Sequence, residues 1–348
     1  MCGGGRGNPV PAGTERHPPV ACPPHGTGET RYTERVRAVV FAGGEVHVES
    51  RADPVPGRGQ LLVRVRAAGL NGADLIQLRG GYPAPPGVPP DIPGLELAGE
   101  VVERGEGASR YALGDRVMSL AGGAGQAELA VVDERIALPV PGAFDWLQAG
   151  GFPEAFITAH DALITQCGLH AGDRLLVTGA AGGVGTAAVQ LGVALGAQVV
   201  GSVRAASLHP AVAALGARVI EPAAVADGGP YDVVLELVGS ASLVTALPAL
   251  APGARVSVIG VGGGSRLELD LLALMGRRAR IMGSTLRSRS ADEKAQAVQR
   301  VRDDLWPLLE QGRLRVVVGH NYGLEEAAAA YARFRAGANL GKIVLRTG

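Results

Sequence analysis

The stretch VTGAAGGVGTAAVQLGVALGAQVVGSV, residues 177–203, decides the fold, because its composition admits two very different structures. It contains no charged side chain and is long enough to cross a bilayer as a helix. Gly179, Gly182, Gly183 and Gly185 oppose a membrane helix, since each would destabilise a helix interior by about 1 kcal/mol. The stretch and its flank instead predict a strand within 173–179, a tight turn, a helix over 185–197 and a strand over 198–203.

The rhythm of the chain changes near Gly150. From about residue 36 to 140, short β-rich runs separated by glycine and proline turns predict an all-β barrel. After Gly150, strand-like runs alternate with helical stretches, which predicts an α/β fold with a doubly wound parallel sheet. The tail predicts a helix from Ala291, a strand over 313–319, another helix and a final strand at 341–347. Residues 1–35, rich in glycine, proline and threonine, are expected to form a disordered extension.

Composition limits the possible partners and compartments. With 348 residues, 47% of them hydrophobic, the chain is long enough for two domains. Its zero net charge gives no electrostatic reason to expect nucleic acid or an anionic membrane as a partner. Cys2, Cys22 and Cys167 form no CxxC pair, and the first residues lack the apolar core of a secretory signal. We therefore expect a cytoplasmic protein without disulfides.

The glycine-rich turn has the position at which doubly wound sheets bind phosphates. A strand precedes it and a helix follows, so backbone amides and the helix dipole would meet an anion there. The GxGxxG pattern fails at one place, where Ala180 replaces the first glycine. An isolated AxGxxG is a weak signal, and a glycine turn needed only for packing is the alternative. In this context we predict a dinucleotide diphosphate bound by Ala181, Gly182, Gly183, Val184 and Gly185.

The end of the second strand favours NADPH over NADH. NAD sites carry a carboxylate there for the ribose hydroxyls, whereas NADP sites carry a cation for the 2′-phosphate. The segment 199–210 contains no carboxylate, but it offers Ser202, Arg204, Ser207 and His209. Arg204 can bind a phosphate with two parallel hydrogen bonds. The alternative is that Arg204 is an ordinary surface arginine.

A barrel, a doubly wound sheet and a returning tail together resemble the medium-chain dehydrogenase/reductase superfamily. NGADLIQLRGGYPAPPGVPPDIPGLELAGEVV at 71–102, FPEAFITA at 152–159, GSTLRSRSADEKA at 283–295 and GKIVL at 341–345 are similar to its ζ-crystallin-like quinone oxidoreductase branch. The resemblance implies a GroES-like catalytic domain of residues 36–155 and 286–348, and a Rossmann NADP-binding domain of residues 156–285. It also implies an active site between the two domains, and a homodimer formed through the edge strand ARIMGSTL.

The resemblance requires a test for zinc, because the superfamily includes zinc alcohol dehydrogenases. Catalytic zinc needs three protein ligands of the Cys, His or carboxylate type. The zinc branch has cysteine at the position of Asn71 and histidine at the position of Leu95, and the barrel lacks the four cysteines of a structural site. We therefore expect no metal.

Hydride transfer to an acceptor that is already electrophilic then remains as the chemistry. By resemblance, Asn71 and Tyr82 would orient or polarise a quinone or an α,β-unsaturated carbonyl. An ordinary Asn-Gly turn and an aromatic side chain stacked on the loop prolines are the alternatives for these two residues. Asp74 is expected to be structural, as a cap or as the partner of an arginine. The resemblance also places further residues beside the cofactor, namely Asn71 itself, Thr158, Gly260, Val261, Leu286 and Lys342.

The chain departs from the family pattern at three positions. Leu208 replaces a lysine that often contacts the 2′-phosphate, so Arg204 would have to bind this group alone or together with His209. Pro222 replaces a tyrosine beside the cofactor, and the fourth strand ends in Glu236 where the family has aspartate. The sequence therefore predicts an NADPH-dependent, zinc-independent reductase of quinones or enones. An enoyl-thioester reductase and a non-catalytic NADPH-binding protein are the alternatives.

Overall fold

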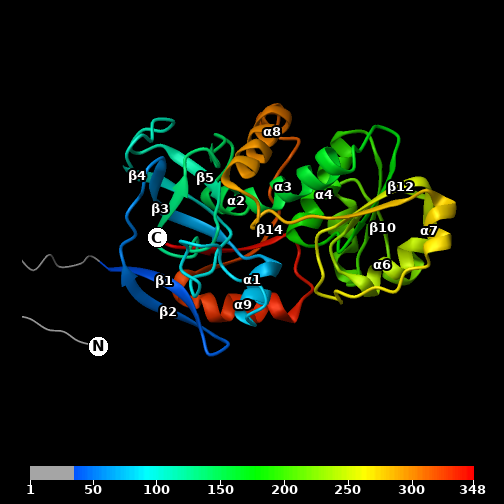
Figure 1. Cartoon of the computed structure of the whole chain (residues 1–348), viewed down its shortest axis with the longest axis horizontal. Helices are drawn as coiled ribbons and strands as arrows, with labels where there is room; N and C mark the ends of the chain where they lie inside the picture. The colour runs from blue at the N-terminus through cyan, green and yellow to red at the C-terminus, as the bar shows by residue number, and fades with distance from the viewer. Residues whose placement is uncertain (1–34) are drawn as a thin grey trace, which may run out of the picture. The chain divides into compact units, whose positions relative to one another are not determined.

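A parallel sheet of six strands forms one half of the protein (Figure 1). The computed structural model describes residues 35–348. The strand order is β10-β9-β8-β11-β12-β13, and every neighbouring pair is parallel. In chain order within the sheet this is 3-2-1-4-5-6, the order of a Rossmann fold. The strands are β8 (Arg174–Thr178), β9 (Gln198–Ser202), β10 (Arg218–Ile220), β11 (Tyr231–Glu236), β12 (Leu250–Val258) and β13 (Arg280–Gly283).

Helices cover both faces of this sheet because successive side chains of its strands point to opposite sides. Leu175 and Val177 pack into one hydrophobic cluster, while Leu176 packs into another with Val200 and Val234. Both clusters are fully apolar, which explains the uncharged runs in the sequence. The surrounding helices are α3 (Pro153–His160), α4 (Gly183–Ala194), α5 (His209–Ala213), α6 (Ser240–Ala246) and α7 (Leu271–Arg277).

The other half is mainly antiparallel and carries the predicted β-rich runs. A sheet of seven strands has the order β14-β15-β3-β4-β5-β7, with β6 paired to β3, and β1 and β2 form a separate hairpin. The strands are β1 (Arg35–Ala42), β2 (Glu45–Ala52), β3 (Gln60–Gly69), β4 (Glu96–Arg104), β5 (Arg116–Leu120), β6 (Leu129–Asp133), β7 (Ala137–Pro139), β14 (Val318–Gly323) and β15 (Lys342–Arg346). The helices are α1 (Gly72–Leu78), α2 (Trp146–Gly150), α8 (Ala291–Glu310) and α9 (Ala327–Ala336).

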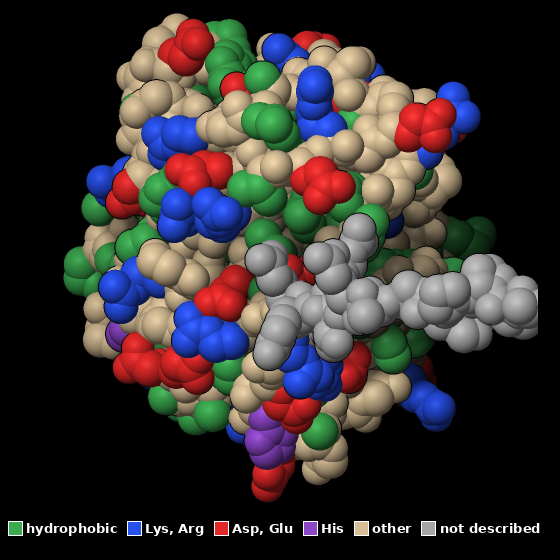
Figure 2. Space-filling view, turned by 90° about the vertical axis from the view of Figure 1, so that its left-hand side faces the viewer, with side chains coloured by type: hydrophobic (Ala, Val, Ile, Leu, Met, Phe, Trp, Pro, Cys, Tyr) green, Lys and Arg blue, Asp and Glu red, His purple; other side chains and the backbone are tan. Residues whose placement is uncertain are grey.

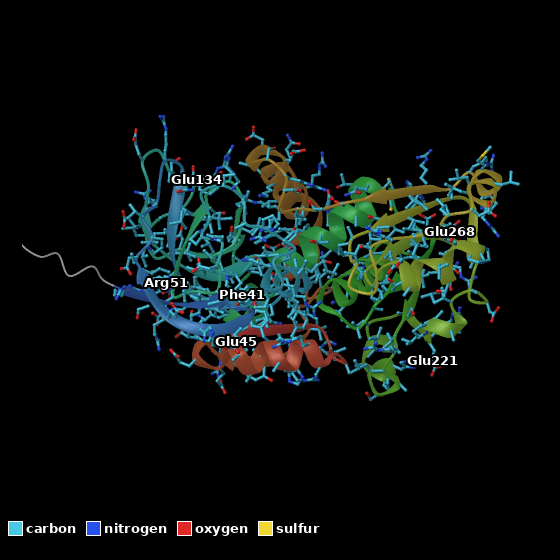
Figure 3. The ribbon with its side chains drawn as sticks, turned by 60° about the horizontal axis from the view of Figure 1, so that its bottom comes forward. Phe41, Glu45, Arg51, Glu134, Glu221 and Glu268 are labelled. Carbon is cyan, nitrogen blue, oxygen red and sulfur yellow. The ribbon has the colours of Figure 1, made fainter. Side chains whose placement is uncertain are left out.

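The hairpin of β1 and β2 lies along α9, as Figure 3 shows near the labelled Phe41. The ring of Phe41 meets that of Tyr331 edge to face, with 5.3 Å between centroids. The buried Tyr331 hydroxyl donates to Gln126 Oε1 at 2.9 Å. The C-terminal helix therefore helps to build the barrel half. On the face seen in Figure 2, acidic and basic side chains are interspersed, in keeping with the zero net charge.

The predicted α/β class, with a barrel half and a Rossmann half, is confirmed. One predicted strand is wrong in position, since the ladder of β14 starts at Val318 rather than at residue 313. The Gln190 side chain of α4 explains this difference, because it binds both the amide and the carbonyl of Arg315, each at 3.0 Å. Leu314 and Val316 are still buried in the core.

Three further sequence predictions concern the membrane, the N-terminus and the domain boundaries. Over residues 35–348, no helix is long and apolar enough to cross a membrane. The predicted disordered extension lies outside the described residues, except for Arg35, which begins β1. The described residues form one compact unit, so the boundaries at residues 155 and 285 stay predictions.

Candidate active site

The turn after β8 has the geometry expected of a phosphate-binding loop. Gly179 adopts a positive φ of 58°, which a residue with a side chain rarely adopts. Gly185 lies so close to this turn that a Cβ there would collide with the Gly179 carbonyl oxygen. α4 then begins at Gly183, and its N-cap residue Gly182 has no side chain to accept the first amides. The first turn of α4 therefore lacks a side-chain cap, which fits a diphosphate as the acceptor.

Ala180 fits in place of the first glycine because its neighbour on β9 lacks a side chain. Ala180 is fully buried. A Cβ built on Gly201 would come within 3.0 Å of the Ala180 Cβ. The alanine methyl group therefore uses space that Gly201 leaves free.

Most other residues predicted to hold the cofactor lie at the same carboxyl edge of the sheet. Ser202 is buried at the end of β9, and Arg204 is exposed two residues further along. The loop after β12 carries Gly260 and Val261, and Leu286 follows β13. The His209 Nε2 atom lies 2.9 Å from the Val203 carbonyl oxygen, so it is engaged with the backbone.

Glu236, the unexplained departure at the end of β11, organises this edge. Its Oε1 atom accepts from the Thr178 hydroxyl at 2.9 Å, the Val238 amide at 2.7 Å and the Gly239 amide at 2.8 Å. The Thr178 hydroxyl oxygen accepts in turn from the Leu237 amide. The longer glutamate therefore ties the ends of β8 and β11 together.

On the barrel side, Asn71 and Lys342 form a buried network with Glu96. The Lys342 ammonium lies 2.5 Å from Glu96 Oε1, and it donates to Asn71 Oδ1 and to the Leu70 carbonyl, each at 2.7 Å. The side-chain amide of Asn71 donates through Nδ2 to Glu96 Oε1 at 3.0 Å. All three side chains are less than a tenth exposed. The Lys342 ammonium therefore binds Asn71, Glu96 and the Leu70 carbonyl at once.

The stem of Lys342 connects this network to the phosphate turn. A Cβ on Gly183 would lie 2.5 Å from Lys342 Cδ, and one on Gly151 would lie 3.2 Å from its Cγ. The preceding residue, Gly341, donates its amide to the Ala181 carbonyl at 2.7 Å. The predicted cofactor residue Lys342 thus lies directly beneath the start of α4.

Asp74 acts as a cap, in agreement with one of its two predicted structural roles. Its Oδ2 atom accepts from the backbone amide of Asn71 at 2.8 Å and from Gln126 Nε2 at 3.3 Å. Asp74 has no arginine partner in the described part of the chain. Burial raises the pKa of Asp74 to about 6, although the Asn71 hydrogen bond opposes this rise.

Tyr82 lies against Arg287, a residue that sequence reasoning did not single out. The guanidinium carbon is 4.8 Å from the centre of the tyrosine ring. Arg287 also donates to the carbonyls of Tyr82 at 2.9 Å and Gly122 at 2.8 Å, and its side chain is buried. Burial raises the pKa of Tyr82 to about 12, with the nearby Glu154 carboxyl adding to the rise and Arg287 opposing it. The phenol therefore stays protonated and can donate a hydrogen bond.

Glu154 is a second residue that the sequence did not reveal. It lies in the first turn of α3, and its amide donates to Glu96 Oε2 at 2.9 Å. Burial raises the pKa of Glu154 to about 8, the Glu96 carboxylate adds to the rise and Lys342 opposes it. One signal was present, since Lys294 and Lys342 are the only lysines of the chain and both lie close enough to affect this pKa.

The donor set at the zinc positions of the superfamily does not fit a metal ion. Leu95 has no ligating atom, and the Asn71 oxygen already accepts from the Lys342 ammonium. In residues 35–348, no group of three or more histidine, cysteine or carboxylate side chains is placed to hold a metal. We therefore assign no step to zinc.

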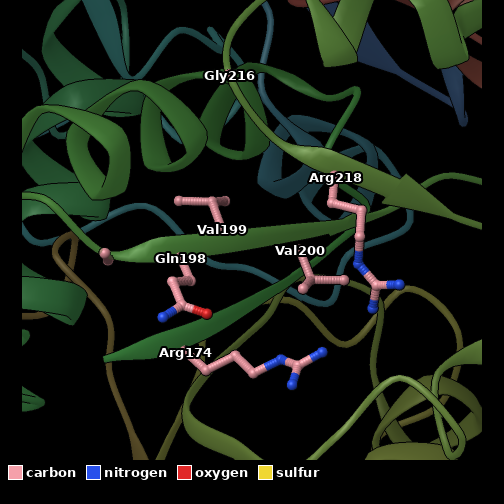
Figure 4. Close-up of a pocket in the computed structure, with 7 residues that line it drawn as sticks. Arg174, Gln198, Val199, Val200, Gly216 and Arg218 are labelled. Carbon is pink, nitrogen blue, oxygen red and sulfur yellow. The ribbon is translucent and has the colours of Figure 1, made fainter. Parts of the chain in front are cut away.

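A pocket of about 490 Å³ lies at the opposite edge of the parallel sheet (Figure 4). Arg174, Gln198 and Arg218, the first residues of β8, β9 and β10, line it. It contains none of the predicted site residues. Ligands of such sheets bind at the carboxyl ends of the strands, so this pocket is not the candidate active site.

Comparison with known proteins agrees with this geometry. Residues 57–165 match the alcohol dehydrogenase GroES-like domain, and residues 210–345 match the zinc-binding dehydrogenase family. Human quinone oxidoreductase is 30% identical over 326 residues, which cover 89% of this chain and 96% of that protein. An alcohol dehydrogenase superfamily protein from Novosphingobium aromaticivorans superposes with a TM-score of 0.80 at 29% identity, covering 90% of this chain and 100% of that one.

A biosynthetic protein is also similar. The spectinabilin polyketide synthase system protein NorB of Streptomyces orinoci is 34% identical over 343 residues. The match covers 93% of this chain but only 15% of NorB.

The fold, the phosphate turn and these relatives together show that the chain belongs to the medium-chain dehydrogenase/reductase superfamily. It is an oxidoreductase that acts on small molecules, and its superfamily implies a nicotinamide cofactor.

Proposed function

We propose that this protein is an NADPH-dependent reductase that transfers hydride to quinones or α,β-unsaturated carbonyls without zinc. The observation that carries the proposal is the hydrogen bond of 2.7 Å between the Lys342 ammonium and Asn71 Oδ1. Asn71 stands at a zinc-ligand position of the superfamily and its oxygen accepts from the Lys342 ammonium, so we infer an acceptor that is electrophilic without a Lewis acid. Quinones and enones meet that condition.

The residues divide the work between the two halves of the protein. The amides from Ala181 to Gly185 would bind the diphosphate, and Thr158 would contact the nicotinamide, which supplies a hydride when reduced. Tyr82 would donate to the acceptor oxygen as negative charge develops on it. The Glu96–Lys342 pair would fix the Asn71 amide.

Arg204 supports the choice of NADPH. It is exposed two residues beyond β9, in a segment without a carboxylate. A free guanidinium at this place can pair with a 2′-phosphate, and no negative side chain of the segment would repel that group.

Enoyl-thioester reduction is a second candidate, favoured by the 34% identity to NorB. The two substrates differ in size, because a thioester carries an acyl chain and a carrier arm. Turnover of acyl thioesters at rates above those of small quinones would favour this candidate.

The experiment that tests the proposal measures NADPH and NADH oxidation with a panel of quinones, enones and enoyl thioesters. Wild type, Arg204→Ala, Tyr82→Phe and the control Arg218→Ala are compared. We expect Arg204→Ala to raise the KM for NADPH at least about tenfold and to leave that for NADH unchanged, because a charge-assisted hydrogen bond contributes about 1.5–3 kcal/mol. Arg218 lies at the far edge of the same sheet, so its removal should change neither KM.

Tyr82→Phe removes only the phenolic hydroxyl, and we expect kcat to fall about 10- to 100-fold. Unchanged kcat would remove Tyr82 from the reaction. Tight NADPH binding without oxidation by any acceptor would instead support a non-catalytic NADPH-binding protein.

A further inference from the structure

Glu154 lies where the barrel half meets the first turn of α3. Its amide is fixed to Glu96 Oε2 at 2.9 Å, so its backbone is tied to the Asn71–Lys342 network. Thr158 follows four residues later on the same helix, and side chains at this spacing share one helix face. Glu154 and the expected nicotinamide neighbour are therefore presented side by side.

The Glu154 carboxyl group has no partner among the described residues. Neither oxygen makes a hydrogen bond or an ion pair within that part of the chain, and the side chain is partly exposed. The two neighbouring acids each have a partner: Glu96 pairs with the Lys342 ammonium, and Asp74 Oδ2 accepts from the backbone amide of Asn71, although Asp74 Oδ1 has no partner in the described chain. A carboxyl group that is open at one side and unpaired is available to a ligand.

Charged and titratable groups from several elements lie close enough to Glu154 to interact with its carboxyl group. Glu96 of β4 and Asp74 of α1 are negative neighbours, and Lys342 of β15 and Lys294 of α8 are positive ones. Tyr82 and Arg287 complete the surroundings. Burial and the acidic neighbours outweigh the lysines, which favours the neutral carboxylic acid at neutral pH.

We propose that Glu154 is the proton donor of the reductase, a role that rests on the proposed function. Its carboxylic acid protonates the acceptor as hydride arrives, while the Tyr82 hydroxyl donates a hydrogen bond to the acceptor oxygen. The unpaired carboxyl group, one helical turn from Thr158 and tied through its own backbone to Glu96, carries this assignment.

The step balances for a quinone acceptor. The bound nicotinamide would supply a hydride, whose electron pair reduces the quinone to the hydroquinone monoanion with one O–H bond. The proton leaves the Glu154 carboxyl group and forms the second O–H bond, on the remaining oxygen. Glu154 remains as a carboxylate and regains a proton from solvent before the next turnover.

The test compares the pH profiles of wild type, Glu154→Gln, Glu154→Asp and the surface control Glu310→Gln. Wild-type kcat should be level at low pH and fall about tenfold per unit above about pH 8, where the acid ionises. Glu154→Gln keeps a neutral side chain of the same size but has no proton to give. We expect its kcat to fall about 10²- to 10⁴-fold with the alkaline limb lost, and Glu310→Gln to behave as wild type.

Lys294→Met supplies a readout that a structural role would not change. Lys294 lowers the pKa of Glu154, so its removal should move the alkaline limb to higher pH. Infrared difference spectra between wild type and Glu154→Gln follow the protonated carboxyl band directly, without turnover, and should show it persisting to about pH 8.

The possible failures are distinguishable. Full activity of a folded Glu154→Gln variant overturns the donor role alone. So does an alkaline limb of the pH profile that keeps its wild-type position in both Glu154→Asp and Lys294→Met. A Glu154 carboxyl band that disappears near pH 4 also overturns it. If Glu154→Gln does not fold, Glu154→Asp and Lys294→Met still decide the matter through the position of the limb. A wild-type protein that reduces no acceptor overturns the proposed function, and the donor role with it.

Discussion

At the scale of single residues, the acids of the candidate site differ in how their charge is balanced. Glu236 accepts three hydrogen bonds, and Glu96 has an ammonium partner. Glu154 has neither, so burial pushes its proton equilibrium toward the neutral form. One residue type therefore serves as structural acceptor, ion-pair partner and candidate acid within a single site.

The stability of the protein should depend on pH through Glu154. Its pKa rises from 4.5 in the unfolded chain to about 8 in the folded one, so the stabilisation is fully present below pH 4.5 and is lost as pH rises through 8. Glu154→Gln cannot ionise, and we expect it to be more stable than wild type at pH 9 by on the order of 2 kcal/mol, but not at pH 4.5.

Urea unfolding at the two pH values measures this difference. Glu310→Gln, in which an exposed carboxylate is replaced, serves as the matched control and should show no pH-dependent gain. An equal stability difference at pH 4.5 and pH 9 would mean that Glu154 ionises normally.

Residue positions within motifs were predictable, but their chemical states were not. The prediction placed Asn71 and Tyr82 in one site by resemblance. Glu154 follows a proline at the start of a helix, where an acid is ordinary and favoured by the helix dipole. Only the folded structure brings Glu96 of a distant strand next to it.

At the scale of elements, β15 joins the barrel half to the phosphate turn. Gly341 bonds to Ala181, and Lys342 places its stem under Gly183 and its ammonium against Glu96 of β4. A single short strand thereby links the network of Asn71, Glu96 and Lys342 to the start of α4. Substitutions in this strand should therefore affect both the network around Glu96 and the start of α4.

Lys342→Met should destabilise the fold by about 3–5 kcal/mol, because it leaves the Glu96 carboxylate buried without a counter-charge. Combining it with Glu96→Gln removes that charge and should recover part of the loss. Lys294→Met, at a partly exposed lysine, should cost less than 1 kcal/mol. Denaturant midpoints measure all three, and equal losses in the single and double variants would contradict the ion-pair argument.

Elements were predicted well wherever the hydrophobic pattern acts on its own. The strands of the parallel sheet follow apolar runs that the helices bury on both faces. The strand predicted over 313–317 is absent, although the segment has the pattern of a strand. The side chain of Gln190 hydrogen-bonds to the backbone amide and carbonyl of Arg315 instead. A competing side chain from a distant helix cannot be read from the segment itself.

At the scale of the whole molecule, the free edge of the parallel sheet supports the predicted homodimer, which we keep as a proposal. In the described chain β13 pairs only with β12, and α7 beside it exposes Leu271, Leu272 and Met275 by 65–76%. An unpaired edge next to exposed apolar side chains is a favourable place for a second copy.

Light scattering should therefore give twice the chain mass of 35.4 kDa. Leu272→Asp combined with Met275→Asp should shift the protein toward monomer, because the charges would be buried in the interface. Val55→Asp, at another exposed apolar residue, should leave the mass unchanged. A wild-type monomer at all concentrations would refute the dimer.

The overall architecture was the most predictable level, since the change from β-rich runs to alternating strands and helices marks the two halves. The acceptor was the least predictable, because its contacts come from loops that converge only in the folded chain. Arg287 illustrates this, as it joins the segment after β13 to the loops of Tyr82 and Gly122.

The most direct measurement is a crystal structure of the protein with NADP⁺ bound. Our account predicts the diphosphate on the amides of Ala181 to Gly185, the 2′-phosphate on Arg204, and the nicotinamide between Thr158 and Tyr82 with Glu154 beside it. A nucleotide bound at the opposite edge of the sheet, or a nicotinamide turned away from Glu154, would contradict it.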